Sequence, residues 1–233
     1  MNTNRNPRHS GYAGSVDDWR KFLSCWHHEA RRRKGYNVTY SLVKRDVLAR
    51  PPDIGDDAIR EEIKKHEKRL GLRLPRSYVD FLIAYYPTET TLKDLEFLHI
   101  SAIDKLDKVF PGWGTEWAAS GANPDDADYF TYGTEQVDVT RARYIKTTLA
   151  VGMHDSDSPF MLLLHPEVLT SDGEMEAEAF FHAGSARTPS FAEMMRRLYY
   201  SKVRPQPGSP PISQEMMRGS CADLLPMTGV WWK

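Results

Sequence analysis

Apolar positions recur at helical spacing in two neighbouring segments of the first half of the chain. The first stripe is Ile59, Ile63, His66 and Leu70, and the second is Tyr78, Phe81, Leu82 and Tyr85. Gly71 stands where a helix needs a left-handed residue after its end, and Pro75 stands where a second helix should begin. The pattern predicts helices over Asp57–Leu70 and Pro75–Tyr86 that pack on each other or on one shared layer.

Side chains near the ends of these helices predict how the ends are satisfied. Asp56 and Asp57 can cap the first helix, and Glu61 and Lys65 are spaced as an i,i+4 ion pair on its exposed face. Leu74 is a poor cap for the second helix, so the first N–H groups of that helix must be satisfied from elsewhere in the fold.

A further helix is expected near the start of the chain, over Ser15–Lys34. Ser15 and Asp18 form an acidic variant of the capping box. The apolar stripe of this helix is Trp19, Phe22, Leu23 and Trp26. The pattern also predicts a strand or a helix over Tyr40–Ala49, a strand over Leu95–Ile100 and a short helix over Ala102–Phe110.

The second half is predicted to be rich in strands. An irregular acidic loop is expected over Thr115–Asp128, and Ser190 is expected to cap a final helix. The expected strands are Tyr129–Tyr132, Thr147–Met153, Phe160–His165 and Glu174–His182. Along the last of them, Glu174, Glu176 and Glu178 alternate with apolar residues, which predicts an acidic outer face that discourages edge pairing.

Composition narrows the class of protein. No apolar run is long enough to form a membrane-spanning helix. The two cysteines, Cys25 and Cys221, are too few and too far apart for a disulfide framework, which favours a reducing cytoplasm.

Charge is distributed unevenly, although the net charge is only −1. Met1–Arg50 holds eleven Lys or Arg against four Asp or Glu, whereas Thr147–Ala186 holds seven Asp or Glu and no Lys or Arg. Such a chain can steer partners of either sign. The cationic run Arg31–Lys34 suits nucleic-acid contact, but one short run is a weak electrostatic footprint, and a solvated helix end is the favoured interpretation.

Three groups of residues suggest chemistry, and each fails on geometry or spacing. Cys25–His28 lacks the glycine of a papain-like nucleophile, and its histidines are poorly placed to act as base for the thiol. The turn His154–Asp157 holds a base, an acid and a hydroxyl, but a tight turn does not give them triad geometry. The spacing of His154, His165 and His182 matches no metal-ligand rule. We therefore expect no enzyme activity, no cofactor and no metal.

The helical hairpin resembles the opening of the SUKH superfamily, which contains fungal cell-wall assembly regulators and bacterial immunity proteins. An apolar helix ending in Leu-Gly is followed by Leu-Pro-x-x-Tyr-x-x-Phe-Leu, and the matching positions are Ile59, Ile63, Leu70, Gly71, Leu74, Pro75, Tyr78, Phe81 and Leu82. A looser match of element order extends the resemblance over Asp56–Tyr200. The resemblance implies an α+β fold, with helices packed against one bent sheet that is mixed or antiparallel, and no catalysis.

The resemblance also implies a domain plan and a function. Residues 51–202 are expected to form the SUKH-like domain, after a basic extension over 1–50 and before a Pro-rich linker and apolar tail over 203–233. The implied function is that of a cytoplasmic immunity protein, which neutralises a bacterial toxin by protein–protein contact without membrane or nucleic-acid binding. A regulatory scaffold of the cell-wall type is the alternative, and an enzyme would need a pocket with convergent polar groups at His154–Asp157.

The acidic half is the expected partner-binding surface, because many toxins attack nucleic acid and have basic active sites that an acidic face complements. The candidate contact residues are Trp113, Glu116, Trp117, Asp125, Asp126, Asp128, Glu135, Asp138, Asp155 and Asp157. The two tryptophans could equally fill space in the core or anchor a partner. Acidic side chains on a surface can also serve solubility alone.

Overall fold

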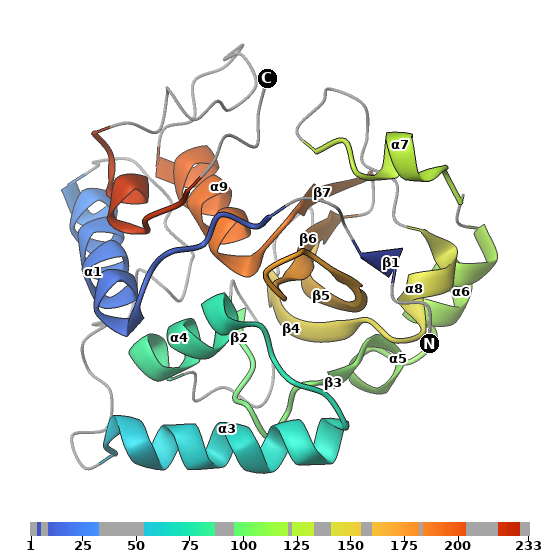
Figure 1. Cartoon of the computed structure of the whole chain (residues 1–233), viewed down its shortest axis with the longest axis horizontal. Coiled ribbons are helices and arrows are strands. Elements are labelled where there is room, and N and C mark those ends of the chain that lie inside the picture. The colour runs from blue at the N-terminus through green and yellow to red at the C-terminus, as the bar shows by residue number, and fades with distance from the viewer. Residues whose placement is uncertain are drawn as a thin grey trace.

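The structure, a computed structural model, describes residues 4–5, 9–32, 54–86, 96–120, 123–132, 141–154, 160–181, 184–203 and 219–228. Its elements form a central sheet with a layer of helices on each face (Figure 1). This α+β architecture confirms the expected fold class. The segment Tyr40–Ala49 and residues 204–218, which are part of the expected linker and tail over 203–233, lie outside the described residues.

The sheet is built on five strands in the order β2-β4-β5-β6-β7, and each neighbouring pair is antiparallel. These strands are β2 Glu96–Phe97, β4 Leu149–His154, β5 Phe160–Leu169, β6 Met175–Phe181 and β7 Gly184–Thr188. Two short strands lie off this path: β1 (Asn4–Arg5) runs parallel to the end of β5, and β3 (Asp104–Lys105) pairs with β4. The sheet is therefore mixed. The register of β5 against β6 shifts between His165 and Leu169, where Pro166 has no N–H to donate.

Strand alternation divides the core between the two faces of the sheet. One face presents Leu149, Val151, Leu162, Leu164, Ala177 and Ala179. The other face presents Ala150, Met161, Leu163 and Phe180. Successive side chains of a strand point to opposite faces, so the nearly continuous apolar runs of β4 and β5 serve both layers.

The larger helical layer combines elements from distant parts of the sequence. It contains α1 Val16–Arg32, α3 Asp56–Leu70, α4 Arg76–Tyr85 and α9 Phe191–Val203. The ring centroids of Trp19 on α1 and Phe81 on α4 lie 5.2 Å apart, and Phe191 on α9 is 5.0 Å from Phe81. The expected basic extension thus places its helix in the same core as the hairpin.

Several predicted helix ends are present. Ser15 Oγ accepts from the Asp18 N–H at 3.4 Å, as in a capping box, and its hydroxyl donates to the Asp18 carboxylate at 2.7 Å. Gly71 follows α3 with a left-handed φ of 71°. Ser190 Oγ accepts from the Glu193 N–H at 3.2 Å at the start of α9.

The N-terminus of α4 is satisfied from across the fold, as its poor local cap predicted. Glu174, the residue before β6, accepts from the Ser77 N–H at 2.8 Å and from the Ser77 hydroxyl at 2.5 Å. Glu67 of α3 accepts from the Leu74 N–H at 2.8 Å. Two buried carboxylates therefore tie α4 to α3 and to the sheet.

Other local predictions are wrong. Gly55, with no side-chain cap, precedes α3, so Asp56 and Asp57 occupy its first turn instead of capping it. Glu61 pairs with Lys64 at 2.6 Å instead of Lys65, because neighbours three apart also share a helix face. The helix expected over Ala102–Phe110 is divided between β3 and α5 (Leu106–Val109), since residues 104–105 pair with β4.

The smaller helical layer replaces a predicted loop and strand. Thr115–Asp128 was expected to be irregular, but α6 (Trp113–Ser120) and α7 (Asp126–Tyr129) lie in it. α7 also occupies the start of the expected strand Tyr129–Tyr132, because the Asp125 side chain caps it and Tyr129 faces the core. The last element of the layer, α8 (Ala142–Ile145), was not predicted.

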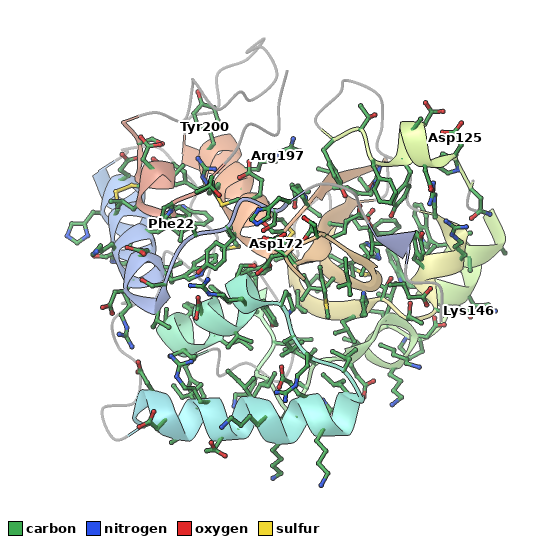
Figure 2. The ribbon with its side chains drawn as sticks, viewed as in Figure 1. Phe22, Asp125, Lys146, Asp172, Arg197 and Tyr200 are labelled. Atoms are coloured by element: carbon green, nitrogen blue, oxygen red, sulfur yellow. A yellow bond between two sulfur atoms is a disulfide. The ribbon has the colours of Figure 1, made fainter. Side chains whose placement is uncertain are left out.

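A disulfide joins Cys25 of α1 to Cys221 of η1 (Cys221–Leu224), and Figure 2 draws the bond in yellow. The expectation that these cysteines form no disulfide is wrong here, because the fold brings their Cα atoms to 5.6 Å. The segment around η1 also pairs with the start of the chain, where Tyr12 bridges to Met227. Among the described residues, no helix is both long and apolar enough to cross a membrane.

Candidate partner-binding surface

Three carboxylates of the predicted contact set are exposed on α7: Asp125, Asp126 and Asp128 (Figure 2 labels Asp125). We refer to these three residues as the acidic surface. Asp125 accepts from the Asp128 N–H at 3.0 Å and so caps the helix. The side chain of Asp126 keeps 69% of its area exposed although it is ion-paired. Glu116 is also exposed, on α6.

A buried arginine holds the acidic surface in place. The side chain of Arg141 is only 1% exposed, and its Nη2 lies 2.7 Å from Asp126 Oδ1. Its Nε donates to the Pro124 carbonyl at 2.9 Å, and its guanidinium carbon lies 4.1 Å from the centroid of the Tyr129 ring. One cation therefore binds the backbone before α7, a carboxylate on α7 and the aromatic residue that ends it.

A second buried cation supports the same ring from β7. The guanidinium carbon of Arg187 lies 3.9 Å from the Tyr129 centroid, and its Nη1 pairs with Glu176 at 3.1 Å. The hydroxyls of Tyr129 and Tyr132 donate to the two oxygens of Glu176 at 2.5 and 2.7 Å. Buried networks of ion pairs and hydrogen bonds of this kind rigidify the elements that they join.

The predicted acidic outer face of β6 is wrong. Glu174, Glu176 and Glu178 are all buried. The smaller helical layer covers the face of β6 that carries Glu176 and Glu178, whereas Glu174, just before β6, lies against Ser77 of α4. Glu178 pairs with His165 at 2.6 Å, and Thr148 Oγ1 lies 2.8 Å from the other ring nitrogen. These carboxylates serve internal ion pairs and helix ends, so they add nothing to a surface for partners.

The two tryptophans of α6 are partly buried and pack on the smaller core cluster. The ring of Trp117 meets Phe180 of β6 edge to face, with centroids 4.2 Å apart. This contact favours the interpretation that Trp117 packs in the core over the interpretation that it anchors a partner.

Four predicted contact residues, Glu135, Asp138, Asp155 and Asp157, lie outside the described residues. The same holds for His182 and for the side chain of His154, so the turn and the three-histidine group expected around them are not described.

The cationic residues that matter most were not singled out from the sequence. Arg187 supplies positive charge to the buried Glu176, and the buried Arg141 holds the exposed Asp126. The sequence did contain a signal for these cations. Phe180 shares a strand face with Glu176 and Glu178, which indicates that the face is buried. Two buried carboxylates need cations nearby.

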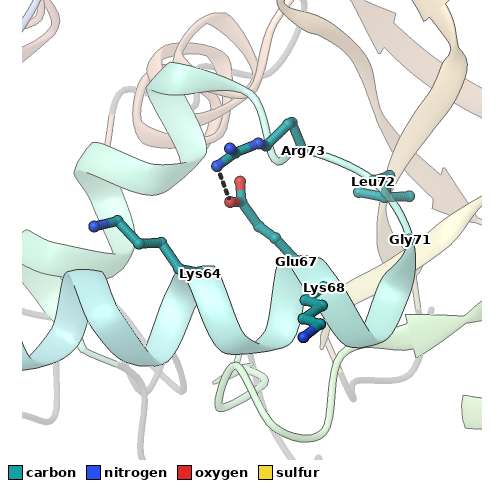
Figure 3. Close-up of a pocket in the computed structure, with 6 residues that line it drawn as sticks. All are labelled: Lys64, Glu67, Lys68, Gly71, Leu72 and Arg73. Atoms are coloured by element: carbon teal, nitrogen blue, oxygen red, sulfur yellow. Dashed lines mark hydrogen bonds and ion pairs between the residues drawn. The ribbon is translucent and has the colours of Figure 1, made fainter.

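A shallow groove lies beside the link between α3 and α4 (Figure 3). Its lining is Lys64, Glu67, Lys68, Gly71, Leu72 and Arg73. Glu67 is engaged by the Arg73 guanidinium at 2.9 Å as well as by the Leu74 N–H. The six lining residues offer cations and one occupied carboxylate, so this groove lacks the paired acid and base that catalysis needs.

Comparison of the chain with family models, with curated proteins and with solved structures gave no match.

Proposed function

We propose that this chain is a protein-binding module of the immunity type, which neutralises a basic toxin domain by covering it. The observation that carries the proposal is the acidic surface: three exposed carboxylates on a short helix that buried Arg141 fixes to the body of the protein. A surface that is already ordered loses little conformational entropy on binding. The resemblance of the hairpin to the SUKH superfamily supports the same class.

The partner that fits this surface is a cationic domain, for which a nuclease toxin is the natural example. Carboxylates that remain exposed speed the encounter with a basic protein and fix its orientation, whereas their contribution to affinity is smaller. We place the complex in the cytoplasm, where such a toxin would act. In that compartment Cys25 and Cys221 would be thiols.

The proposal is tested with the toxin domain encoded in the neighbouring reading frame. Co-expression of the two chains should restore growth of a bacterial host that the toxin alone kills, and the purified chains should form a stoichiometric complex. Host death despite normal levels of the folded chain contradicts the immunity function.

The surface is tested separately by stopped-flow association. Asp128→Lys should slow association several-fold at low ionic strength and much less at high salt, because screening removes the steering. The matched control reverses one exposed carboxylate of α3, Glu61→Lys, and should leave the rate nearly unchanged. Equal rates for the two variants would exclude the acidic surface.

A further inference from the structure

Two cysteines and a glutamate converge where α1 meets η1. Cys25 and Glu29 lie one turn apart on α1, and Cys221 comes from η1. The Sγ atoms and a Glu29 carboxylate oxygen all lie within 4.8 Å of one another. Spacing of i and i+4 places two side chains on one helix face, where both can reach the same bound ion.

A hydrogen-bond donor orients the carboxylate of this group. The hydroxyl of Tyr199 on α9 donates to Glu29 Oε2 at 2.7 Å and accepts from the Cys221 N–H at 3.3 Å. Metal-binding carboxylates are commonly held by such a partner.

The site is closed on one side and open on the other. Cys221 is 1% exposed, whereas Cys25 and Glu29 are half-buried. Arg196 Nε donates to the Ala222 carbonyl at 3.1 Å and so holds η1 beside α9 independently of the sulfur atoms. The ring of Phe22 on α1 also packs against the ring of Tyr199 on α9, with centroids 5.7 Å apart, so the ligand atoms of α1 and η1 stay close when the disulfide is opened.

We propose that Cys25, Cys221 and Glu29 bind Zn²⁺ when the disulfide is reduced, with water in the fourth position. Zinc takes thiolates at about 2.3 Å and carboxylate oxygens at about 2.0–2.2 Å, so its tetrahedral ligands lie roughly 3.3–3.8 Å apart, a spacing that the convergence at this site allows. The site does not depend on the function proposed above.

A dithiol reductant supplies the two electrons and two protons that reduce the Cys25–Cys221 disulfide. One of its thiolates attacks a cysteine sulfur, its second sulfur resolves the mixed disulfide, and the reductant leaves oxidised while Cys25 and Cys221 become thiols. Zn²⁺ then displaces one proton from each thiol and binds the two thiolates together with the Glu29 carboxylate. The metal thus replaces the disulfide as the tie between α1 and η1.

The test titrates Zn²⁺ and Co²⁺ into the full chain under anaerobic conditions, with a phosphine reductant that does not compete for metal as a thiol would. The reduced chain should bind one Zn²⁺, and Co²⁺ should give thiolate charge-transfer absorption with tetrahedral ligand-field bands. The oxidised chain should bind neither ion at this site. A reduced, folded chain without zinc binding, or a cobalt spectrum without the thiolate band, overturns the proposal.

Variants identify the ligands. Glu29→Gln should weaken zinc binding at least tenfold and Tyr199→Phe about tenfold, as loss of a ligand and of its hydrogen-bond partner predict. Asp17→Asn, in the first turn of the same helix, should bind as the wild type does. Circular dichroism checks that each variant is folded, and the comparison of oxidised with reduced wild type decides the matter if Glu29→Gln or Tyr199→Phe unfolds. Unchanged affinity in Glu29→Gln excludes the three-ligand site.

Discussion

Burial and hydrogen bonding shift the pKa of Glu174 in opposite directions. Burial raises the pKa of its carboxyl from 4.5 to about 7, against the lowering effect of the two hydrogen bonds from Ser77. The nearby carboxylates Asp172 and Asp80 raise the pKa further. The folded chain therefore keeps a proton on Glu174 at pH values where an unfolded chain has lost it.

The free energy of unfolding should fall as pH rises from about 4.5 to about 7 and level off above that, because the folded state binds more protons in this window. Glu174 contributes on the order of 3 kcal/mol to this fall in the free energy of unfolding. Glu174→Gln cannot ionise and should lose this slope in denaturant unfolding measured across the window. Glu61→Gln, at a side chain that is 70% exposed, should keep the wild-type slope. An unchanged slope in Glu174→Gln would contradict the assignment.

Phe81 contacts several other aromatic rings of the core. Its ring centroid lies 4.7 Å from that of Phe97 in addition to its contacts with Trp19 and Phe191. Phe81→Ala should lower the free energy of unfolding by about 3–5 kcal/mol, because it leaves a cavity in a close-packed site. Guanidinium unfolding measures the change, and Val79→Ala, at a partly buried position of the same helix, should cost about 1 kcal/mol. A change within error for Phe81→Ala would place that residue outside the core.

Among the elements, α7 depends most on a single side chain. Arg141→Ala should raise amide hydrogen exchange of Tyr129 and Phe130, whose N–H groups donate to Asp125 and Asp126, about tenfold or more. Exchange in β5 should be unaffected. Arg143→Ala is the matched control, because Arg143 is exposed and also contacts the Tyr144 hydroxyl, at 2.9 Å. Equal protection of α7 in both variants would mean that Arg141 does not hold it.

The elements with strong periodic patterns could be predicted from the sequence. α1, α3, α4, β5 and β6 have either a full apolar stripe or a long apolar run. α6, α7, α8 and β7 are short, and tertiary contacts rather than local pattern decide their conformation. β7 makes β6 a central strand, and the smaller helical layer buries the face of β6 that carries Glu176 and Glu178.

The candidate surface could be predicted in part. The acidic residues of α7 are exposed, as a run of aspartates suggests. Charge counting along the chain did not distinguish them from Glu176 and Glu178, because a count carries no information on which face a strand buries.

At the scale of the whole molecule, the disulfide closes a loop with a sequence separation of 196 residues. Reduction should lower the free energy of unfolding by about 2–5 kcal/mol when a chelator keeps zinc away, because the unfolded chain regains the entropy of the open loop. Guanidinium midpoints of the oxidised and reduced chains, both with chelator, measure the difference. Equal midpoints would mean that noncovalent contacts alone hold η1 on α1.

The packing of α1 against η1 and α9 also has a consequence during synthesis on the ribosome. α1 emerges before η1, because Cys221 is made 196 residues after Cys25. At about 5–20 residues per second, roughly 10–40 s separate the two. Until then Trp19, Phe22 and Trp26 lack part of the surface that buries them. A cell that makes this protein must therefore shield an amphipathic helix on the nascent chain for tens of seconds.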